Sequence, residues 1–160
     1  MKLRYRLMDI VAKVIQTQRF YRYRLLGYSN IEKGVILESK LLLDKVYPQG
    51  IHIGANTLVA SHALILCHEH VKRDPTDVRA PWVTETYIGR NCFIGVLATV
   101  LPGVKIGDEV IVGASTVVTK DVPSNCVVVG NPGRIVKRNI RMSSKATLIR
   151  ATEAAADHNA

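Results

Sequence analysis

A six-residue repeat runs through the middle of the chain, from about Val35 to Val122. Small or β-branched residues recur four positions after each repeat position, and Gly or Ala often follows it directly. Short strands separated by tight bends are the structure that this spacing predicts. Eleven of the twelve repeat positions are Val, Ile or Leu; the twelve are Val35, Leu41, Tyr47, Ile53, Val59, Ile65, Ile88, Ile94, Val100, Ile106, Val112 and Val118.

Three such units close one triangular coil, so the chain is predicted to be an all-β parallel β-helix. Each aliphatic residue would point inward and stack on the one eighteen residues away, and the coils would be joined by parallel hydrogen bonds. An α-helix needs spacings of three and four, and antiparallel hairpins need turn sequences such as Asn-Gly, which are missing here. The predicted β-helical domain covers residues 29–136.

The two ends of the chain differ from this repeat. Residues 1–28 carry seven basic groups against Asp9 alone, and residues 2–26 are predicted to form an amphipathic basic helix. This helix either caps the open end of the coil or lies on a membrane surface, and the cap is favoured because an exposed end invites edge pairing. After Gly130-Asn131-Pro132-Gly133, a basic tail at 137–160 is expected to contain a short helix.

Length and composition restrict the function classes. At 160 residues the chain is long enough for one domain, and no apolar run is long enough to span a bilayer. The N-terminus lacks the pattern of a secretory signal, and three cysteines without CxxC spacing fit a reducing cytoplasm. No nucleic-acid-binding motif occurs despite the net charge of +9, so nucleic acid is not an expected partner.

An insertion interrupts the repeat between Ile65 and Ile88, which are not separated by a multiple of six. The predicted insert loop spans residues 69–86 and carries Trp82, the only tryptophan. His68 stands directly before it and is a candidate general base, because imidazole accepts a proton near neutral pH. The alternative is a solvated corner histidine.

Two further chemistries are weaker. Four histidines cluster, and His52 and His70 are eighteen apart, so a zinc site is a rival; it would need a third convergent ligand, and no metal is expected. Cys67 next to His68 suggests a thiol nucleophile, but neighbouring residues of a strand point to opposite faces. Glu69, Asp74 and Asp77 are possible partners of a histidine.

From His62 to Arg138 the chain resembles the hexapeptide-repeat acetyltransferases, especially the galactoside and maltose acetyltransferases and the polysaccharide O-acetyltransferases. The sequences LILCHEH and IVGASTVVTKDVP and the closing Gly-Asn-Pro-Gly-Arg carry this resemblance. It implies left-handed coils, a homotrimer, and acetyl-CoA lying in a cleft between neighbouring subunits. It also implies that His68 deprotonates an acceptor hydroxyl, with a backbone amide at Gly95–Val96 stabilising the oxyanion.

The resemblance further implies contacts to acetyl-CoA at defined positions of this chain. Arg134 and Arg138 would face the nucleotide phosphates, and the acceptor region is less clear because the upstream spacing of the galactoside branch does not align. The acceptor candidates are Glu38, Asp44, His70 and Trp82. The remaining acetyl-CoA contacts are Gly95, Val96, Ala114, Thr119 and Lys120.

Together these features predict a cytoplasmic, trimeric, acetyl-CoA-dependent O-acetyltransferase. Its expected acceptor is a sugar hydroxyl in surface polysaccharide or lipid-linked glycan biosynthesis, which could bring the basic helix to the inner face of the membrane. The alternative acceptor is the amino group of a nucleotide-linked sugar. Outside this class, a zinc-dependent hydratase similar to carbonic anhydrase and a non-catalytic β-helical scaffold stay open.

Overall fold

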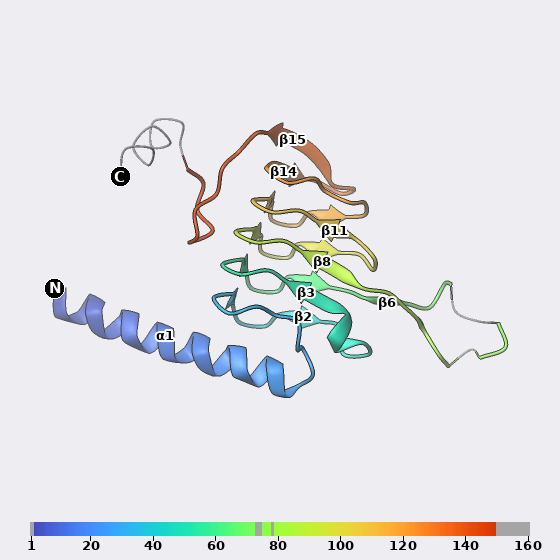
Figure 1. Cartoon of the computed structure of the whole chain (residues 1–160), viewed down its shortest axis with the longest axis horizontal. Helices are drawn as coiled ribbons and strands as arrows, with labels where there is room; N and C mark the ends of the chain where they lie inside the picture. Colours follow the sequence, from blue (N-terminus) through green and yellow to red (C-terminus); the bar gives the residue numbers. More distant parts are fainter. Residues whose placement is uncertain (1, 73–74, 78, 150–160) are drawn as a thin grey trace.

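The computed structural model describes residues 2–72, 75–77 and 79–149. A stack of coils forms the body of the molecule, and helix α1 (Lys2–Leu25) runs beneath the first coil (Figure 1). The chain ascends through the stack, so that β14 and β15 lie at the end opposite to α1. The helix has almost the bounds that the apolar spacing predicts.

Three parallel sheets form the three sides of the stack, each built from one short strand of each successive coil. The first sheet contains, in order, β1 (Ile36–Leu37), β4 (Leu58–Val59), β9 (Phe93–Ile94), β12 (Ile111–Val112), β14 (Cys126–Val129) and β15 (Arg134–Arg138), the last of them antiparallel. The second sheet contains β2 (Leu42–Leu43), β5 (Leu64–Ile65), β10 (Thr99–Val100) and β13 (Val117–Val118). The third contains β3 (Ile51–Ile53), β8 (Thr86–Ile88) and β11 (Lys105–Ile106).

The upper coils follow the predicted period. Val100 pairs with Val118 and Ile94 with Val112, eighteen residues apart in each case. These side chains are at most 1% exposed and stack along the axis of the coil, while the residue before each of them faces outward. The aliphatic repeat therefore forms the core of the molecule, as its spacing predicts.

The first coil departs from the predicted register. Leu37 pairs with Val59 and Leu43 with Ile65, so one turn takes twenty-two residues here. The extra residues form the corner at 44–50, which includes a short 3-10 helix at Pro48–Gly50. The prediction that Val35, Leu41 and Tyr47 occupy the stacked aliphatic positions was therefore wrong, because an extended corner in the first coil shifts the register.

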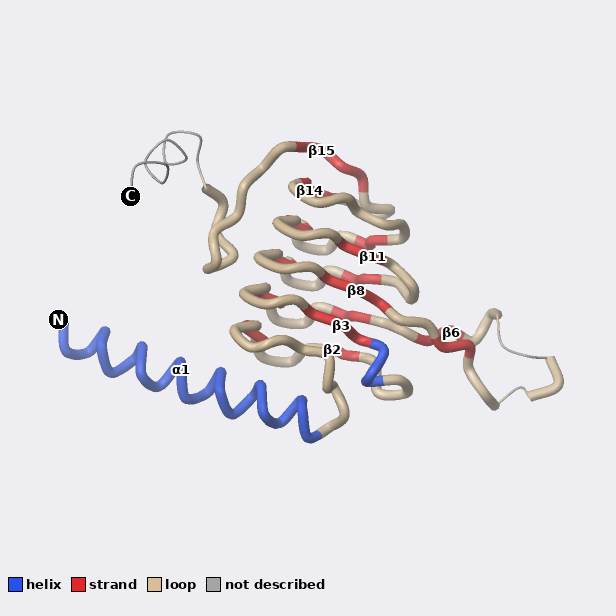
Figure 2. The backbone as a smooth tube through the Cα atoms, in the orientation of Figure 1, coloured by secondary structure: helices blue, strands red, loops and turns tan. Residues whose placement is uncertain are grey.

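The C-terminal part of α1 covers the open end of the stack. Phe20 and Tyr23 pack against the core, and the Nη1 atom of Arg19 donates a hydrogen bond to the carbonyl of Leu37 at 2.5 Å. Ile10 and Val14, nearer the N-terminus, are about half exposed. Capping thus involves the last turns of the helix, while the preceding turns extend beyond the coils (Figure 2). In the described part of the chain, no helix is both long and apolar enough to cross a membrane.

The other end of the stack is covered by a strand. Residues 134–138, expected to lead into a tail with a short helix, form β15 and pair antiparallel with β14. Between 139 and 149 the chain makes turns and one bridge between Met142 and Leu148, without helix. The helix prediction was wrong for these residues, because the turn at Gly130–Gly133 sends the chain back along the free edge of β14. Residues 150–160 lie outside the described part.

Candidate functional site

The insert leaves the stack at the corner between the second and third sheets. β6 (His68–Glu69) and β7 (Trp82–Val83) pair antiparallel and form its base. The Thr84 amide donates to the carbonyl of Cys67 at 2.9 Å, and the Thr86 hydroxyl to that of Leu66 at 2.6 Å. Since β8 still pairs with β3, the loop extends outward without breaking the third sheet. His68 is thereby held at the edge of a rigid scaffold.

His68 is paired with a buried carboxylate of the coil below. Its Nδ1 atom lies 2.5 Å from Oδ2 of Asp44, whose side chain is fully buried, whereas the His68 side chain is 21% exposed. Burial favours the protonated form of Asp44, but hydrogen bonds from the Cys67 amide, from His68 and from two further amides outweigh it and lower the pKa of Asp44. An ionised Asp44 accepts a hydrogen bond from Nδ1–H of His68, which leaves Nε2 without a proton as the atom that can act as a base.

Asp44 was predicted to contact the acceptor, and its geometry assigns it another place. Oδ1 accepts from the amides of Val46 at 2.9 Å and Tyr47 at 3.3 Å, and Oδ2 accepts from the amide of Cys67 at 2.8 Å. All acceptor positions are thus occupied from within the chain. The acidic partner of His68 comes from the extended first-coil corner. Neither Glu69 nor Asp77 fills this place, and Asp74 lies outside the described residues.

Tyr28 supports the same corner from below and was not identified from the sequence. Its hydroxyl donates to the carbonyls of Asp44 at 2.9 Å and Leu43 at 3.2 Å. Burial, together with the nearby ionisable groups Tyr23, Asp44 and Cys67, raises the pKa of Tyr28 to about 12, so the hydroxyl stays a donor. Tyr28 could have been identified from the sequence only if the register of the first coil had been known.

The loop residues at the base of the insert form two groups, one on each face of the β6–β7 ribbon. The ring of His70 meets that of His68 edge-on at 5.4 Å between centroids. The ammonium of Lys72 lies 4.8 Å from the centre of the Trp82 ring and 3.2 Å from Glu69. Of the two predicted acceptor contacts in the insert, His70 therefore lies beside His68, whereas Trp82 is paired with Glu69 and lies on the opposite face of the β6–β7 ribbon.

Two other candidate residues, Cys67 and Glu38, do not lie at the exposed side of His68. Cys67 is buried, its Sγ donates to the carbonyl of Tyr47 at 2.9 Å, and burial raises its pKa to about 12, so it is an unreactive thiol. Glu38 lies at the opposite edge of the second sheet, where Oε2 accepts from the amide and the hydroxyl of Ser61, both at 2.9 Å. The structure therefore does not bring Glu38 together with His68.

The predicted acetyl-CoA contacts fall into two groups. Gly95, Val96 and Ala114 lie at the corner between the first and second sheets, on successive coils. The amide of Gly95 donates to the carbonyl of Val112 at 2.9 Å and is not available to an oxyanion. In the described residues the amides of Val96 and Ala114 have no such acceptor, and both residues are exposed. Val96, and not Gly95, is the position of this pair with an available donor.

The second group lies at the top of the stack. Thr119, Lys120 and Arg134 line a cavity of about 270 Å³, at the same corner of the coil as His68 but two coils higher. Arg138 is not part of this lining, because its Nη1 atom points toward Sγ of Cys126 at 3.8 Å. The structure thus brings Arg134, one of the two residues predicted to face the nucleotide phosphates, together with Thr119 and Lys120, and leaves Arg138 apart from them.

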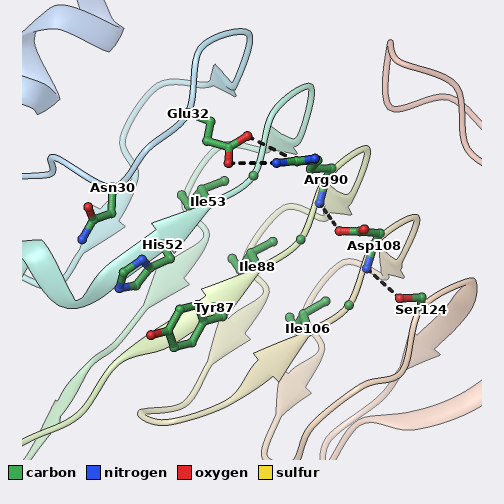
Figure 3. Close-up of a pocket in the computed structure, with 13 residues that line it drawn as sticks. Asn30, Glu32, His52, Ile53, Tyr87, Ile88, Arg90, Ile106, Asp108 and Ser124 are labelled. Atoms are coloured by element: carbon green, nitrogen blue, oxygen red, sulfur yellow. Dashed lines mark hydrogen bonds and ion pairs between the residues drawn. The ribbon is translucent and has the colours of Figure 1, made fainter.

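The outer face of the third sheet carries a polar groove of about 450 Å³ (Figure 3). His52 stacks on Tyr87 at 4.2 Å between ring centres, and Glu32 forms an ion pair with Arg90 at 3.4 Å. The zinc alternative required His52 to lie next to His70, but His52 stacks on Tyr87 instead. Among the residues that the structure describes, no three His, Cys, Asp or Glu side chains are grouped so that they could hold a metal ion.

Comparison with known proteins connects these features to one family. Residues 85–120 match the family model "Bacterial transferase hexapeptide (six repeats)". The chain is 33% identical over 123 residues to the proposed acetyltransferase YvoF of Bacillus subtilis (strain 168), covering 77% of this chain and 68% of YvoF. It is 35% identical over 100 residues to WbbJ of Escherichia coli (strain K12), a proposed O-acetyl transferase of lipopolysaccharide biosynthesis, covering 56% of this chain and 51% of WbbJ.

A solved structure shows the same relationship in three dimensions. A galactoside acetyltransferase in complex with coenzyme A superposes with a TM-score of 0.56 at 25% identity, over 68% of this chain and 64% of that chain. The chain thus spans about two thirds of the length of YvoF and about half of that of WbbJ.

Proposed function

The chain belongs to the hexapeptide-repeat acetyltransferase family, and on this premise we propose that it transfers the acetyl group of acetyl-CoA to a hydroxyl of a sugar. Membership of the family implies left-handed coils. The observation that carries the proposal is the pair formed by His68 and the buried Asp44 at the base of the insert. A histidine oriented by a carboxylate is a recurring arrangement for proton transfer in acyl transfer.

In the proposed reaction His68 acts as the general base. Its Nε2 atom takes the proton of the acceptor hydroxyl while the oxygen attacks the thioester carbonyl, which forms a tetrahedral intermediate. The C–S bond then breaks, and the imidazolium returns the proton to the leaving thiolate of CoA. Asp44 acts as a positioning residue, because it fixes the tautomer and the orientation of the ring. No acyl-enzyme is required, since both substrates are held together.

Backbone amides and basic side chains of the upper coils are the proposed donor contacts. The amides of Val96 and Ala114 suit the carbonyl groups of the pantetheine arm, and Val96 is the proposed oxyanion donor. The cavity at Thr119, Lys120 and Arg134 suits the nucleotide phosphates, because Arg binds phosphate through a planar pair of donors. Since strands stack about 4.8 Å apart, two coils place this cavity about 10 Å above His68.

A homotrimer is proposed because a single chain separates the two halves of this site. Val96 and His68 lie at opposite edges of the second sheet, so a neighbouring copy has to supply one half to the other. The outward side chains of the first two sheets are suited to burial between copies, while the third sheet presents His52, Tyr87 and Lys105. Those of the first two sheets are Ile36, Leu58, Phe93, Ile111, Val127, Leu42, Leu64, Thr99 and Val117.

The proposed acceptor is a glycan of the cell surface or its lipid-linked precursor. The similarity to WbbJ supports this acceptor, as does the basic helix that lies beneath the first coil. A cytoplasmic location follows from it, because acetyl-CoA and the precursors of such glycans meet there.

Release of CoA thiol in the presence of sugar acceptors tests the proposal. His68→Asn is expected to lower kcat by about 10²–10⁴-fold, the usual contribution of a general base. His52→Asn is the matched control: His52 lies on the outer face of the third sheet, where it stacks on Tyr87, away from both halves of the proposed site. Equal rates for the wild type and His68→Asn would remove His68 from the mechanism. A solution mass of one chain would contradict the site between subunits.

A further inference from the structure

A cavity of about 750 Å³ lies between α1 and the first coil, at the end of the stack opposite to the proposed donor phosphates. Arg19 and Arg22 reach it from the helix, and Lys40 and Lys45 from the coil. Tyr23 and Tyr28 are among its other lining residues. Its size is within the range of cavities that hold small-molecule ligands.

Four cations line this cavity without acidic partners. In the described part of the chain, none of Arg19, Arg22, Lys40 and Lys45 forms an ion pair. The only carboxylate in the lining, Glu38, is engaged by the amide and hydroxyl of Ser61. The walls therefore carry an excess of three positive charges, and an anion entering the cavity would neutralise cations that the protein leaves uncompensated.

The cavity is also connected to the proposed catalytic pair. Leu43 and Lys45 belong to its lining and flank Asp44, whose carboxylate holds His68. The hydroxyl of Tyr28, which also lines the cavity, donates to the Asp44 carbonyl. The first coil lies one strand spacing, about 4.8 Å, below the coil of His68. The cavity and His68 thus belong to adjacent coils and meet at the corner of Asp44.

We propose that this cavity binds the phosphate or diphosphate of an acceptor whose sugar hydroxyl is presented to His68. This inference rests on the proposed acetyl transfer and names the acceptor as a phosphorylated or diphosphate-linked sugar. Guanidinium groups match phosphate oxygens with paired donors, and ammonium groups add compact charges. The donor phosphates belong to the other end of the stack, so this second basic site takes a different anion.

Calorimetry with inorganic pyrophosphate tests the cavity without catalysis. The titration is performed on the full chain in saturating CoA, so that the donor site is occupied. The variant Arg22→Gln/Lys40→Gln removes one cation from the helix and one from the first coil. Lys13→Gln/Lys33→Gln is the matched control, because it removes the same charge from the same two segments outside the cavity lining.

We expect pyrophosphate to bind the wild type and the control, and to bind Arg22→Gln/Lys40→Gln at least about thirtyfold more weakly, since hydrogen bonds to charged groups are lost. Equal affinity in all three proteins, or equal loss in both variants, would overturn the cavity assignment. This measurement stays decisive even if no acetyl transfer is found, so the failure of the inference and of the proposed function are separate results.

Steady-state kinetics then identify the source of the phosphate. A neutral methyl glycoside, a nucleoside-diphosphate sugar and a prenyl-diphosphate sugar in detergent serve as acceptors. For whichever diphosphate-linked sugar serves as acceptor, Arg22→Gln/Lys40→Gln is expected to raise KM by about tenfold or more and to leave kcat little changed. For the neutral methyl glycoside, KM and kcat should both change little. A preference between the two diphosphates assigns the source. A uniform change for neutral and charged acceptors would contradict the inference.

Discussion

Replacement of Asp44 by Asn removes the charge of the buried carboxylate while keeping its shape. The carboxylate accepts hydrogen bonds from three backbone amides and from Nδ1 of His68. An Asn side chain has one acceptor oxygen, and its NH₂ group faces a backbone N–H group in either orientation. One buried donor is therefore left without an acceptor, at a cost of about 1–3 kcal/mol. The other hydrogen bonds lose their charge assistance, which adds about 1 kcal/mol.

The free energy of unfolding is thus expected to fall by roughly 2–4 kcal/mol, less than the whole stability of an ordinary domain. The folded variant should show a kcat lower by about 10²–10⁴-fold with little change in KM for acetyl-CoA, because His68 loses its fixed tautomer. Urea unfolding, CoA release and ¹⁵N spectra of the imidazole measure these effects. The spectra should show Nδ1–H in the wild type and a mixture of tautomers in the variant.

Glu32→Gln is the matched control for this substitution. Glu32 is also a first-coil carboxylate that accepts a second-coil amide, that of Ala55 at 2.9 Å, but it lies away from the proposed site. The kcat of Glu32→Gln should equal that of the wild type. A kcat of Asp44→Asn within threefold of wild type, with an unchanged tautomer, would refute the positioning role of Asp44.

Three further predictions concern stability and packing. The pKa of Asp44 is lowered in the folded state, so its contribution to stability is present above the ordinary Asp pKa of about 3.9 and is lost as the pH falls through the folded-state pKa. The urea concentration at the unfolding midpoint should therefore decrease when the pH is lowered below about 4, and it should decrease less steeply for Asp44→Asn. Gly95→Ala should lower the urea midpoint and weaken CoA binding in calorimetry, because its Cβ would lie 2.6 Å from the Ala114 amide nitrogen; unchanged values of both would contradict this close approach. A thiol reagent should label less than about a tenth of one thiol per native chain and all three after unfolding, since all three cysteines are buried and burial raises the pKa of the Cys67 thiol to about 12 and of Cys92 to about 11; rapid labelling of the native chain would refute their burial.

The sequence predicted the coils well wherever the period is regular. Val100 and Val118 stack as the six-residue spacing requires, because eighteen residues complete one turn. The first coil was placed wrongly because Val35 and Leu41 are apolar and buried in either register. A search in steps of six cannot detect four extra residues at a corner when the residues on both sides are aliphatic.

The same corner explains what was missed at the candidate site. His68 was identified from its place before the insert, but Asp44 and His68 are twenty-four residues apart and not the eighteen of a regular turn. Only the three-dimensional pairing of Leu43 with Ile65 shows that the two residues meet. The tail was predicted to contain a short helix, whereas the free edge of β14 offered hydrogen bonds that a strand could satisfy.

The constant rise of the stack has a consequence for how such a chain can diverge. Each coil adds one strand spacing, about 4.8 Å, so the number of residues between two corner positions determines their separation along the axis. Insertion of one eighteen-residue coil between His68 and Lys120 would preserve every hydrogen-bonding pattern and still shift the two residues apart by one step. With the donor placed as proposed above, the length of donor that this molecule accepts is set in discrete steps, by a count of coils, while corner loops of any length can vary without altering it.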